Sequence, residues 1–367
     1  MLKNIVFTSF LRSILTQVMA ALKEFDFLQL FVGLIDDSKS GRRVKKDGNK
    51  IRPSTIEFYE VVYKDLQAFV VNEAYNLRIR NVNRFTTRQM NAETRYWKRF
   101  YKRYSDYLYS QGCYDNYVGS HFKVIRTFFN YLKIEKGLFV GDFHKLFYVR
   151  TEDIPIVVLS TEQFQFLIHD EVFEESLPAK LKRCKDIMVF GGTVGLRYSD
   201  LMALTKKNIE TVYDTKYLKV RSKKTGTDTS IKLPEYACAI IHRYRGLKTL
   251  LPQVSLAQMN DNMKLLCEKA GWTQEVGKLR SKRGVVKKVT DKGKPYRFCD
   301  LVSTHIMRRT SITTLLSLGM PESMVRKISG HAAGSKEFYK YVHYAQQFLD
   351  KETDMVFDKL AMKKIRL

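Results

Sequence analysis

The sequence predicts a mainly α-helical protein with one small β-hairpin or sheet, divided into two domains. Apolar residues recur at helical spacing through most of the chain, and several of these segments begin with a capping motif. Only residues 216–234 show short alternating runs around a glycine-containing turn. Residues 137–159 show neither period, as expected of a linker, and 367 residues are enough for two domains.

The composition indicates a folded protein with a negatively charged partner. Hydrophobic residues make up 44% of the chain, so proper cores can form. A formal net charge of +26 favours nucleic acid as the partner and an anionic membrane as the second candidate. No apolar run of about 18 residues exists, so we expect no transmembrane helix. Five scattered cysteines without a CxxC pair predict reduced thiols in a cytoplasmic protein.

The first 150 residues predict a helical domain, 49–150, preceded by an N-terminal segment, 1–48. Apolar spacing in residues 5–22 predicts an amphipathic helix rather than a signal peptide, and the basic, polar residues 36–52 predict a linker or flexible loop. A capping box at Ser54–Glu57 predicts a helix to about Phe69. Two more helices are expected over 91–110 and 120–134.

The predicted helix 91–110 has an aromatic face and a basic face. Trp97, Phe100 and Tyr104 lie on one side at helical spacing. Five basic residues occupy other positions: Arg95, Lys98, Arg99, Lys102 and Arg103. The basic face indicates either an ordinary solvated surface or one that follows nucleic-acid phosphates.

The second domain is predicted over 158–345 and opens with a capping box at Ser160–Gln163. Helices are expected over 161–169, 179–191, 199–206, 235–245 and 255–270. The hairpin at 216–234 carries Lys223 and Lys224 in its turn. Residues 278–297 contain nine Lys or Arg and one Asp, which predicts an exposed basic loop. From His305 onward the pattern is helical, with breaks near Gly319 and Gly330.

Two segments carry side chains suited to phosphate chemistry. Residues 195–200 (Gly-Leu-Arg-Tyr-Ser-Asp) supply Arg197, and residues 305–341 supply Arg308, two histidines and tyrosines. Arginine forks bind phosphate oxygens bidentately and stay charged, and nearby cations favour the phenolate of a tyrosine. No compact carboxylate cluster, HExxH or P-loop motif appears. These side chains could therefore attack a phosphodiester without a metal or other cofactor.

Each of these residues, taken alone, has a simpler structural explanation. Arg197 and Asp200 could form a helix-surface ion pair, and His305 could be a partly buried histidine. His331, after Gly330, could belong to a helix C-terminus, and lysines in a hairpin turn are usually solvated. Their joint occurrence, in this order on a basic two-domain chain, favours a phosphate site.

These motifs resemble the tyrosine recombinases, the phage integrase family. The resemblance rests on Gly195–Asp200, on Thr304–Thr310, on Ser329-Gly330-His331 and on a following tyrosine, in that order. It covers about 158–345, and the basic helical region before it matches the family's core-binding domain in kind, without a specific motif. The resemblance implies a two-domain DNA clamp in which a helical core-binding domain precedes a mixed α/β catalytic domain.

The resemblance also implies roles for the site residues. Arg197 and Arg308 would clamp the scissile phosphate, and Asp200 would support the site from the same helix as Arg197. His305 would assist proton transfer, and His331 would hydrogen-bond the phosphate.

A hairpin lysine would be the general acid, with Lys224 preferred to Lys223. The nucleophile is expected to be Tyr341, which follows His331 by ten residues where the family commonly has nine. Tyr339 and Tyr344 remain alternatives.

The function that the resemblance implies is site-specific recombination by the integrase of a mobile genetic element. The enzyme would cut DNA through a 3′-phosphotyrosyl intermediate, without a cofactor, as a tetramer on two double-stranded DNA sites. Accessory DNA-bending proteins are further candidate partners. A type IB topoisomerase and a catalytically silent DNA-binding protein are the alternatives.

The tail, 346–367, is expected to form an amphipathic helix that docks on a neighbouring protomer or on its own domain. Its apolar face would carry Phe348, Met355, Val356 and Leu360. Whether 1–48 binds separate DNA sites stays open.

Overall fold

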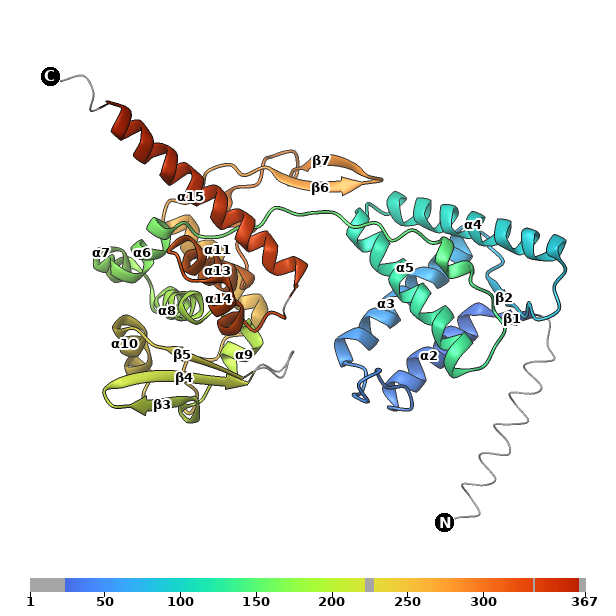
Figure 1. Cartoon of the computed structure of the whole chain (residues 1–367), viewed down its shortest axis with the longest axis horizontal. Helices are drawn as coiled ribbons and strands as arrows, with labels where there is room; N and C mark the ends of the chain where they lie inside the picture. Colours follow the sequence, from blue (N-terminus) through green and yellow to red (C-terminus); the bar gives the residue numbers. More distant parts are fainter. Residues whose placement is uncertain (1–23, 222–227, 333, 363–367) are drawn as a thin grey trace, which may run out of the picture. The chain divides into compact units, whose positions relative to one another are not determined.

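The computed structural model describes residues 24–221, 228–332 and 334–362. These residues divide into two compact units (Figure 1). The first holds the described residues up to Ile154 together with Leu279–Lys288, and the second holds Pro155–Lys278 and the described residues from Val289 onward. The mainly helical fold with small sheets is confirmed. The helix predicted over 5–22, and the lysines Lys223 and Lys224, lie outside the described residues.

The first unit is a helical bundle with a short two-stranded sheet. Its elements up to Ile154 are β1 (Glu24–Asp26), α2 (Phe27–Lys39), α3 (Pro53–Asn72), β2 (Arg78–Arg80), α4 (Thr87–Ser110), α5 (Asp115–Asn130), the π-helix η1 (Tyr131–Glu135) and the 3-10 helix η2 (Phe143–Leu146). Strands β1 and β2 pair antiparallel, with Phe25 opposite Ile79.

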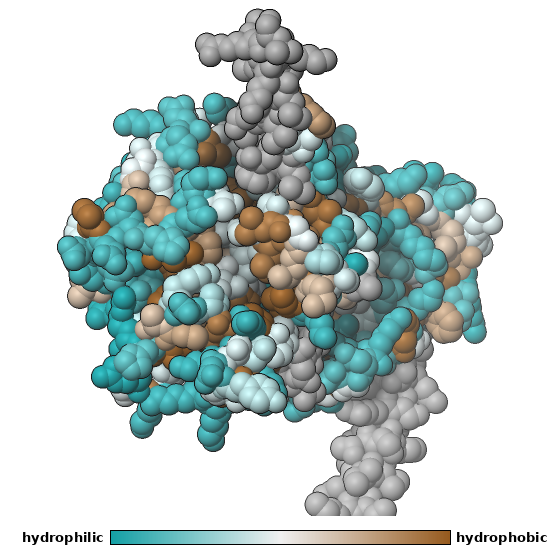
Figure 2. Space-filling model, turned by 60° about the vertical axis from the view of Figure 1, so that its left-hand side comes forward, coloured by the Kyte–Doolittle hydropathy of each residue, from teal (hydrophilic) through white to brown (hydrophobic). Residues whose placement is uncertain are grey.

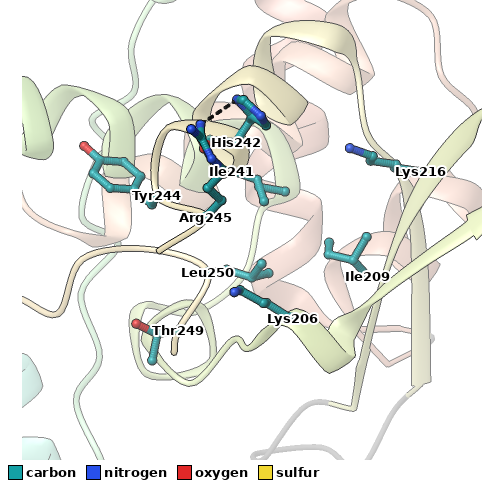
Figure 3. Close-up of a pocket in the computed structure, with 9 residues that line it drawn as sticks. All are labelled: Lys206, Ile209, Lys216, Ile241, His242, Tyr244, Arg245, Thr249 and Leu250. Atoms are coloured by element: carbon teal, nitrogen blue, oxygen red, sulfur yellow. Dashed lines mark hydrogen bonds between the residues drawn. The ribbon is translucent and has the colours of Figure 1, made fainter. Parts of the chain in front are cut away.

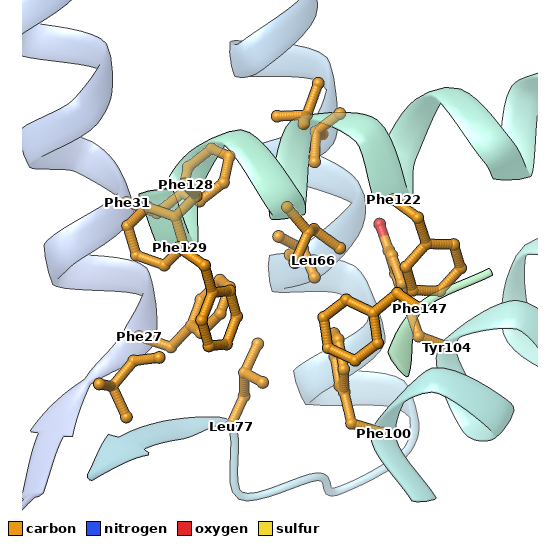
Figure 4. Packing of buried hydrophobic residues seen from close by; sticks show 14 of the residues in the cluster. Phe27, Phe31, Leu66, Leu77, Phe100, Tyr104, Phe122, Phe128, Phe129 and Phe147 are labelled. Carbon is orange, nitrogen blue, oxygen red and sulfur yellow. The ribbon is translucent and has the colours of Figure 1, made fainter. Parts of the chain in front are cut away.

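Aromatic side chains fill the core of this bundle (Figure 4). Phe27 of α2 contacts Phe128 of α5 with ring centroids 4.7 Å apart, and Trp97 of α4 meets Phe129 at 5.0 Å. The predicted aromatic face of 91–110 is confirmed, since Trp97, Phe100 and Tyr104 are all buried. Large rings contribute much apolar area for each residue ordered, which suits a bundle of only a few helices.

Two sequence predictions for this unit are wrong. Pro53 is the first residue of α3 and Arg52 is its N-cap, without a side-chain cap, so the capping box at Ser54–Glu57 does not form. Proline is favoured at the first helical position because its missing N–H is unpaired there anyway. The predicted linker 36–52 begins too early, because α2 continues to Lys39.

The second unit combines helices with one antiparallel sheet. Its elements are α6 (Thr161–His169), α7 (Glu171–Ser176), α8 (Ala179–Val194), α9 (Tyr198–Met202), the 3-10 helix η3 (Lys206–Asn208), β3 (Ile209–Val212), β4 (Thr215–Arg221), β5 (Asp228–Lys232), α10 (Glu235–Arg243), α11 (Leu256–Lys269), α12 (Phe298–Leu301), α13 (His305–Ser317), α14 (Glu322–Ser329) and α15 (Lys336–Met362). The capping box at Ser160–Gln163 is confirmed.

The predicted hairpin is part of a three-stranded sheet in the order β3-β4-β5. Leu218 of β4 lies opposite Ile231 of β5, and both are buried. Strand β3, which the sequence pattern did not reveal, pairs with the other edge of β4 through residues such as Ile209. Lys223 and Lys224 fall in the sequence between the end of β4 and the start of β5.

Helices α8 and α13 cross closely because two glycines lie in α8. A Cβ atom at Gly191 would come within 2.5 Å of the Met307 sulfur, and one at Gly192 would come within 2.6 Å of the Phe164 ring. These glycines therefore allow α13 and α6 to approach the backbone of α8. This close approach fixes the start of α13 relative to the end of α8. Candidate site residues lie at the start of α13 and just after the end of α8.

The prediction of an exposed loop over the basic segment 278–297 is wrong. It contains two strands, β6 (Lys278–Lys282) and β7 (Val285–Val289), which pair as a two-stranded sheet. Residues Leu279–Lys288 of this hairpin belong to the first unit, although both flanking segments belong to the second.

The described residues end in α15, which carries Tyr341 and continues through much of the predicted tail helix. The side chains of Phe348, Met355, Val356 and Leu360 lie outside the described ones, so the predicted apolar face stays a prediction. Figure 2 shows hydrophilic side chains over much of the visible surface, with hydrophobic ones in patches between them. None of the helices in 24–221, 228–332 and 334–362 combines the length and apolar character needed to span a bilayer.

Candidate active site

Arg197 is placed by the end of helix α8. Gly195 terminates α8 in the left-handed conformation, with φ of 65°, and its N–H donates to the carbonyl oxygen of Gly191. A side chain is disfavoured there, and a Cβ atom would also lie 2.7 Å from the Ser311 hydroxyl. The chain then turns sharply, so that Arg197 becomes the N-cap of α9 and Asp200 lies buried in that helix.

Arg308 is buried on α13 and links the ends of two other helices. Its guanidinium donates to the carbonyl oxygen of Gly195, at 2.9 Å, and to that of Ser329 at the end of α14. Burial and the nearby positive charge of Arg197 lower the pKa of Arg308 to about 10, while Tyr341 and Asp200 act in the opposite direction. The guanidinium therefore remains charged at neutral pH, and Arg197, Asp200 and Tyr341 all lie within its electrostatic reach.

His331 follows a second left-handed glycine. Gly330 caps α14 with φ of 61°, and the N–H of His331 donates to the carbonyl oxygen of Arg326. His331 therefore belongs to a helix C-terminus, as the simpler explanation proposed, and it also lies beside Arg308. Its ring nitrogens lie 3.4 and 3.5 Å from the Arg308 Nη2 atom.

Hydrogen bonding at Ser329 favours the His331 tautomer that carries its proton on Nδ1, which leaves Nε2 free to accept a hydrogen bond from Arg308. The Ser329 hydroxyl donates to the carbonyl oxygen of Val325, at 2.7 Å, so its oxygen can accept the Nδ1–H of His331, at 2.8 Å. Burial and the charges of Arg308 and Arg197 lower the pKa of His331 to about 4, which leaves the ring neutral at pH 7. An arriving phosphate would raise that pKa, because it brings negative charge beside the ring.

The three candidate tyrosines differ in their surroundings. The Tyr341 ring lies 6.0 Å from the His331 ring, between centroids, and its hydroxyl influences the pKa of Arg308. Tyr339 is 49% exposed, and its ring lies 6.5 Å from that of Phe338. Burial raises the pKa of Tyr344, and no charged group opposes that effect. Of the three, only Tyr341 has contacts to the Arg308–His331 cluster among the described residues.

His305 occupies the first position of α13 and is exposed. It precedes Arg308 by three residues, so both lie on one side of the helix. The start of α13 is held by the N–H of Thr304, which donates to the side chain of Asn260 on α11 at 2.8 Å. The structure therefore brings together Arg197, Arg308, His331 and Tyr341, and it places His305 one turn from Arg308.

Two supporting residues were not assigned by sequence reasoning. Ser329 bonds both to His331, through its hydroxyl, and to Arg308, through its carbonyl oxygen. In the sequence, only its position directly before Gly330 and His331 could have indicated this role. Asn260 holds the start of α13 from a helix more than forty residues upstream, and the sequence gives no indication of that contact.

A separate pocket of about 390 Å³ lies elsewhere in the second unit (Figure 3). Lys206, Lys216, His242 and Arg245 contribute polar atoms to its lining, and Leu250 is among its apolar residues. Arg245 lies 3.4 Å from His242 Nδ1, the contact drawn as a dashed line. This pocket shares no lining residue with the arginine cluster and includes none of the predicted site residues.

Comparison with solved structures finds the same fold. The chain resembles XerH site-specific recombinase bound to a palindromic difH substrate, with a TM-score of 0.57 and 12% identity over 89% of this chain and 95% of that one. It resembles a lambda integrase tetramer bound to a Holliday junction, with a TM-score of 0.54 and 13% identity over 86% and 80%. The Tn1549 transposon integrase in complex with circular intermediate DNA matches with a TM-score of 0.53 and 15% identity over 86% and 94%.

Comparison with curated proteins finds no match. The model of the phage integrase family matches residues 162–347, which is half of the chain and includes the whole arginine, histidine and tyrosine cluster. The chain therefore belongs to the phage integrase family, the tyrosine recombinases.

Proposed function

We propose that this protein is a site-specific DNA recombinase, the integrase of a mobile genetic element, that cuts DNA through Tyr341. The observation that carries the proposal is the convergence of Arg308, His331 and Tyr341 in one cluster within the field of Arg197. Two guanidinium groups suit the non-bridging oxygens of a phosphodiester, because they remain charged and donate in a planar fork.

In the proposed reaction the Tyr341 oxygen attacks phosphorus, and the bond from phosphorus to the 5′ oxygen breaks. Arg197 and Arg308 stabilise the charge that builds on the phosphate, and His331 hydrogen-bonds one of its oxygens. His305 assists removal of the phenolic proton, and Lys224 donates a proton to the leaving 5′ oxygen. The product is a 3′-phosphotyrosyl link and a 5′-hydroxyl, and the partner strand's 5′-hydroxyl reverses the step.

The first unit contributes a candidate surface for double-stranded DNA. Arg88, Arg95, Arg99 and Lys102 lie along one side of α4, opposite the buried face of Trp97, and all four are exposed. Among the described residues these four form no ion pair, which leaves them available to phosphates. Arg103, predicted on the same basic face, instead pairs with Glu73 at 2.6 Å.

Strand exchange requires two DNA sites, for which we propose a tetramer of this chain. The lambda integrase neighbour forms a tetramer on a Holliday junction. The C-terminal part of α15 is the candidate contact between protomers. Deleting residues 346–367 should then impair synapsis of two sites more than binding to one site, and unchanged recombination after the deletion would rule out this role.

The proposal is tested with the DNA that flanks the gene's own element. Two copies of the site on one supercoiled plasmid should recombine, while a plasmid without the site should remain unchanged. Relaxation of any supercoiled plasmid would instead indicate a type IB topoisomerase. Binding without any covalent adduct would indicate a catalytically silent DNA-binding protein.

A further inference from the structure

The β6–β7 hairpin, here called the ribbon, is a strongly basic element that completes the first unit. Residues 278–289 contain six Lys or Arg and no Asp or Glu. Its turn is formed by Arg283 and Gly284, whose φ angles of 59° and 81° are both in the left-handed region. Such a two-residue turn suits the twist of a hairpin but is costly for a residue with a side chain. Something must therefore hold Arg283 in this conformation.

Asp115 holds the turn from the start of helix α5. One carboxylate oxygen accepts the backbone N–H of Arg283, at 2.8 Å, and the other accepts that of Gly284, at 2.7 Å. The carboxylate is 2% exposed and also accepts the Tyr109 hydroxyl, at 2.6 Å. The Arg283 guanidinium lies over the Tyr109 ring and pairs with Asp106 at 2.6 Å. The turn is thus held by hydrogen bonds from its backbone to Asp115 and by the ion pair between Arg283 and Asp106.

Glu152 holds the first strand of the ribbon. Its carboxylate accepts Nε and Nη2 of Arg280, at 3.0 and 2.7 Å, and the backbone N–H of Ser281. The Arg280 guanidinium also lies 4.5 Å from the centre of the Tyr114 ring. Burial alone would raise the pKa of Glu152, but these hydrogen bonds hold it below its usual range. Leaving this carboxylate buried without Arg280 would be strongly unfavourable, so the ribbon is held firmly.

Docking leaves a set of ribbon lysines without an acidic partner. Lys287 and Lys288 are exposed on β7, and Lys282 is half-buried beside the turn. None of the three forms an ion pair among the described residues. Arg280 and Arg283 anchor the ribbon to the rest of the first unit. The lysines add positive charge to this unit, in which Arg88, Arg95, Arg99 and Lys102 already form an exposed basic side of α4.

We propose that the ribbon is a DNA-binding element of the first unit, fastened by Asp115 and Glu152, whose lysines contact backbone phosphates. This inference rests on the proposed function, because it takes double-stranded DNA as the partner. A two-stranded ribbon is also an element that a DNA groove can accommodate. The two carboxylates act as positioning residues and do not touch DNA.

The lysines are tested by replacing both Lys287 and Lys288 with alanine. Each lost phosphate contact lowers the slope of log affinity against log salt by about 0.9. The double variant should therefore bind the cognate site more weakly, with a salt slope reduced by about 2. A double variant with wild-type affinity and slope would overturn the proposal.

The anchoring is tested by Glu152→Gln, with Glu57→Gln as the matched control because Glu57 is exposed on α3. Each change removes one negative charge, which on charge alone strengthens binding to DNA. We expect Glu57→Gln to bind as tightly as the wild type or more tightly, and Glu152→Gln to bind more weakly because the ribbon detaches. Equal or tighter binding by Glu152→Gln would contradict the anchoring role.

Arg280→Ala repeats the test from the ribbon side and leaves the bundle's own residues intact. Its salt slope should fall by more than the single unit expected for one charge. Hydrogen exchange at Ser281, Arg283 and Gly284 should be slow in the wild type and faster in Arg280→Ala. Exchange at equal rates in both proteins would refute the docked ribbon. Covalent adduct formation is measured alongside, so a chain that forms no adduct would contradict the proposed function separately from the ribbon.

Discussion

At the scale of single residues, Arg308 holds the candidate site together. Its guanidinium donates to carbonyl oxygens at the ends of α8 and α14, the two helices that lead into Arg197 and His331. The same group is proposed to bind the scissile phosphate. One side chain therefore both positions the site and acts in it, and only a planar fork with several donors can do both.

Replacing Arg308 with lysine tests whether Arg308 both positions the site and binds the phosphate. Lysine keeps the charge but cannot reach both carbonyl oxygens and a phosphate, so we expect covalent cleavage to slow by about 10²–10³-fold. Affinity for DNA should change much less. Single-turnover adduct formation measures the effect, and Arg309→Lys on the next position of α13 is the control. Similar rates for the two variants would contradict the role of Arg308.

Burial of His121 predicts that the stability of the first unit depends on pH. It is fully buried, bonded through Nδ1 to the Tyr104 hydroxyl at 2.8 Å, and burial lowers its pKa to about 4. The unfolded chain takes up a proton near pH 6.5 and the folded chain does not. The contribution of His121 to stability is therefore complete above about pH 6.5 and is expected to fall as the pH drops toward 4. The loss is at most about 3 kcal/mol, because the Asp65 carboxylate, 3.4 Å from Nε2, favours the protonated ring.

Denaturant unfolding at pH 7 and pH 5 measures this effect. The His121→Phe variant, which cannot titrate, should lose less stability than the wild type over the same interval. An equal loss in both proteins would show that other groups cause the acid sensitivity.

Sequence reasoning could propose the arginines, histidines and tyrosines of the candidate site because their order and spacing are visible along the chain. It preferred Tyr341 to Tyr339 by resemblance, and their different surroundings are visible only in the structure. The Tyr341 ring lies near that of His331, and Tyr341 interacts electrostatically with Arg308. The anchoring roles of Asp115 and Glu152 were equally hidden, because their partners lie more than a hundred residues away. Lys224 stays a prediction.

At the scale of elements, two glycines in the left-handed conformation position Arg197 and His331. Gly195 ends α8 before Arg197, and Gly330 ends α14 before His331. In both places the helix must stop within one residue so that the next side chain turns toward α13. The carbonyl oxygens left free at these ends are the ones that Arg308 binds.

Gly195→Ala tests the importance of this turn. Alanine at φ of 65° is strained, and its Cβ atom would press on Ser311, so we expect a loss of about 1–3 kcal/mol in the free energy of unfolding. Cleavage should fall further than stability explains, because Arg197 shifts. Gly246→Ala, where a Cβ atom meets nothing within 4 Å, is the control. Wild-type cleavage by Gly195→Ala would show that the turn is not required.

The helices were largely predictable, because apolar period and capping residues act locally. Helix α6 begins and ends where the sequence predicted, behind its capping box. Strand β3 and the pair β1–β2 were not. β1 and β2 are only three residues long and pair between positions as far apart as Glu24 and Arg80. β3 has four residues, none of them buried, and it shows no alternation of apolar and polar residues. The basic segment read as a loop forms strands because its contacts with Asp115 and Glu152 fix a turn that composition alone does not indicate.

At the scale of the whole molecule, charge and chain connectivity are the main features. The first unit is built from two separated stretches of sequence, so the chain passes between the units three times. Division of the chain near residue 154 lies within the expected linker, whereas assignment of the ribbon to the first unit required the structure. The net charge of +26 is spread over elements of both units.

This charge predicts a steep salt dependence of DNA binding. If six to ten phosphates are contacted, affinity should fall by about 10³–10⁵-fold between 50 and 200 mM salt. Titration of a labelled site at several salt concentrations gives the slope. A nearly flat dependence would mean that the exposed lysines and arginines do not bind phosphates.

The central claim is that the chain cuts DNA by forming a covalent bond from Tyr341. A suicide substrate, nicked so that the cleaved end diffuses away, traps this intermediate on the protein. We predict an adduct with the wild type and with Tyr339→Phe, none with Tyr341→Phe, and a DNA-linked peptide that contains Tyr341. An adduct that persists in Tyr341→Phe would contradict the account.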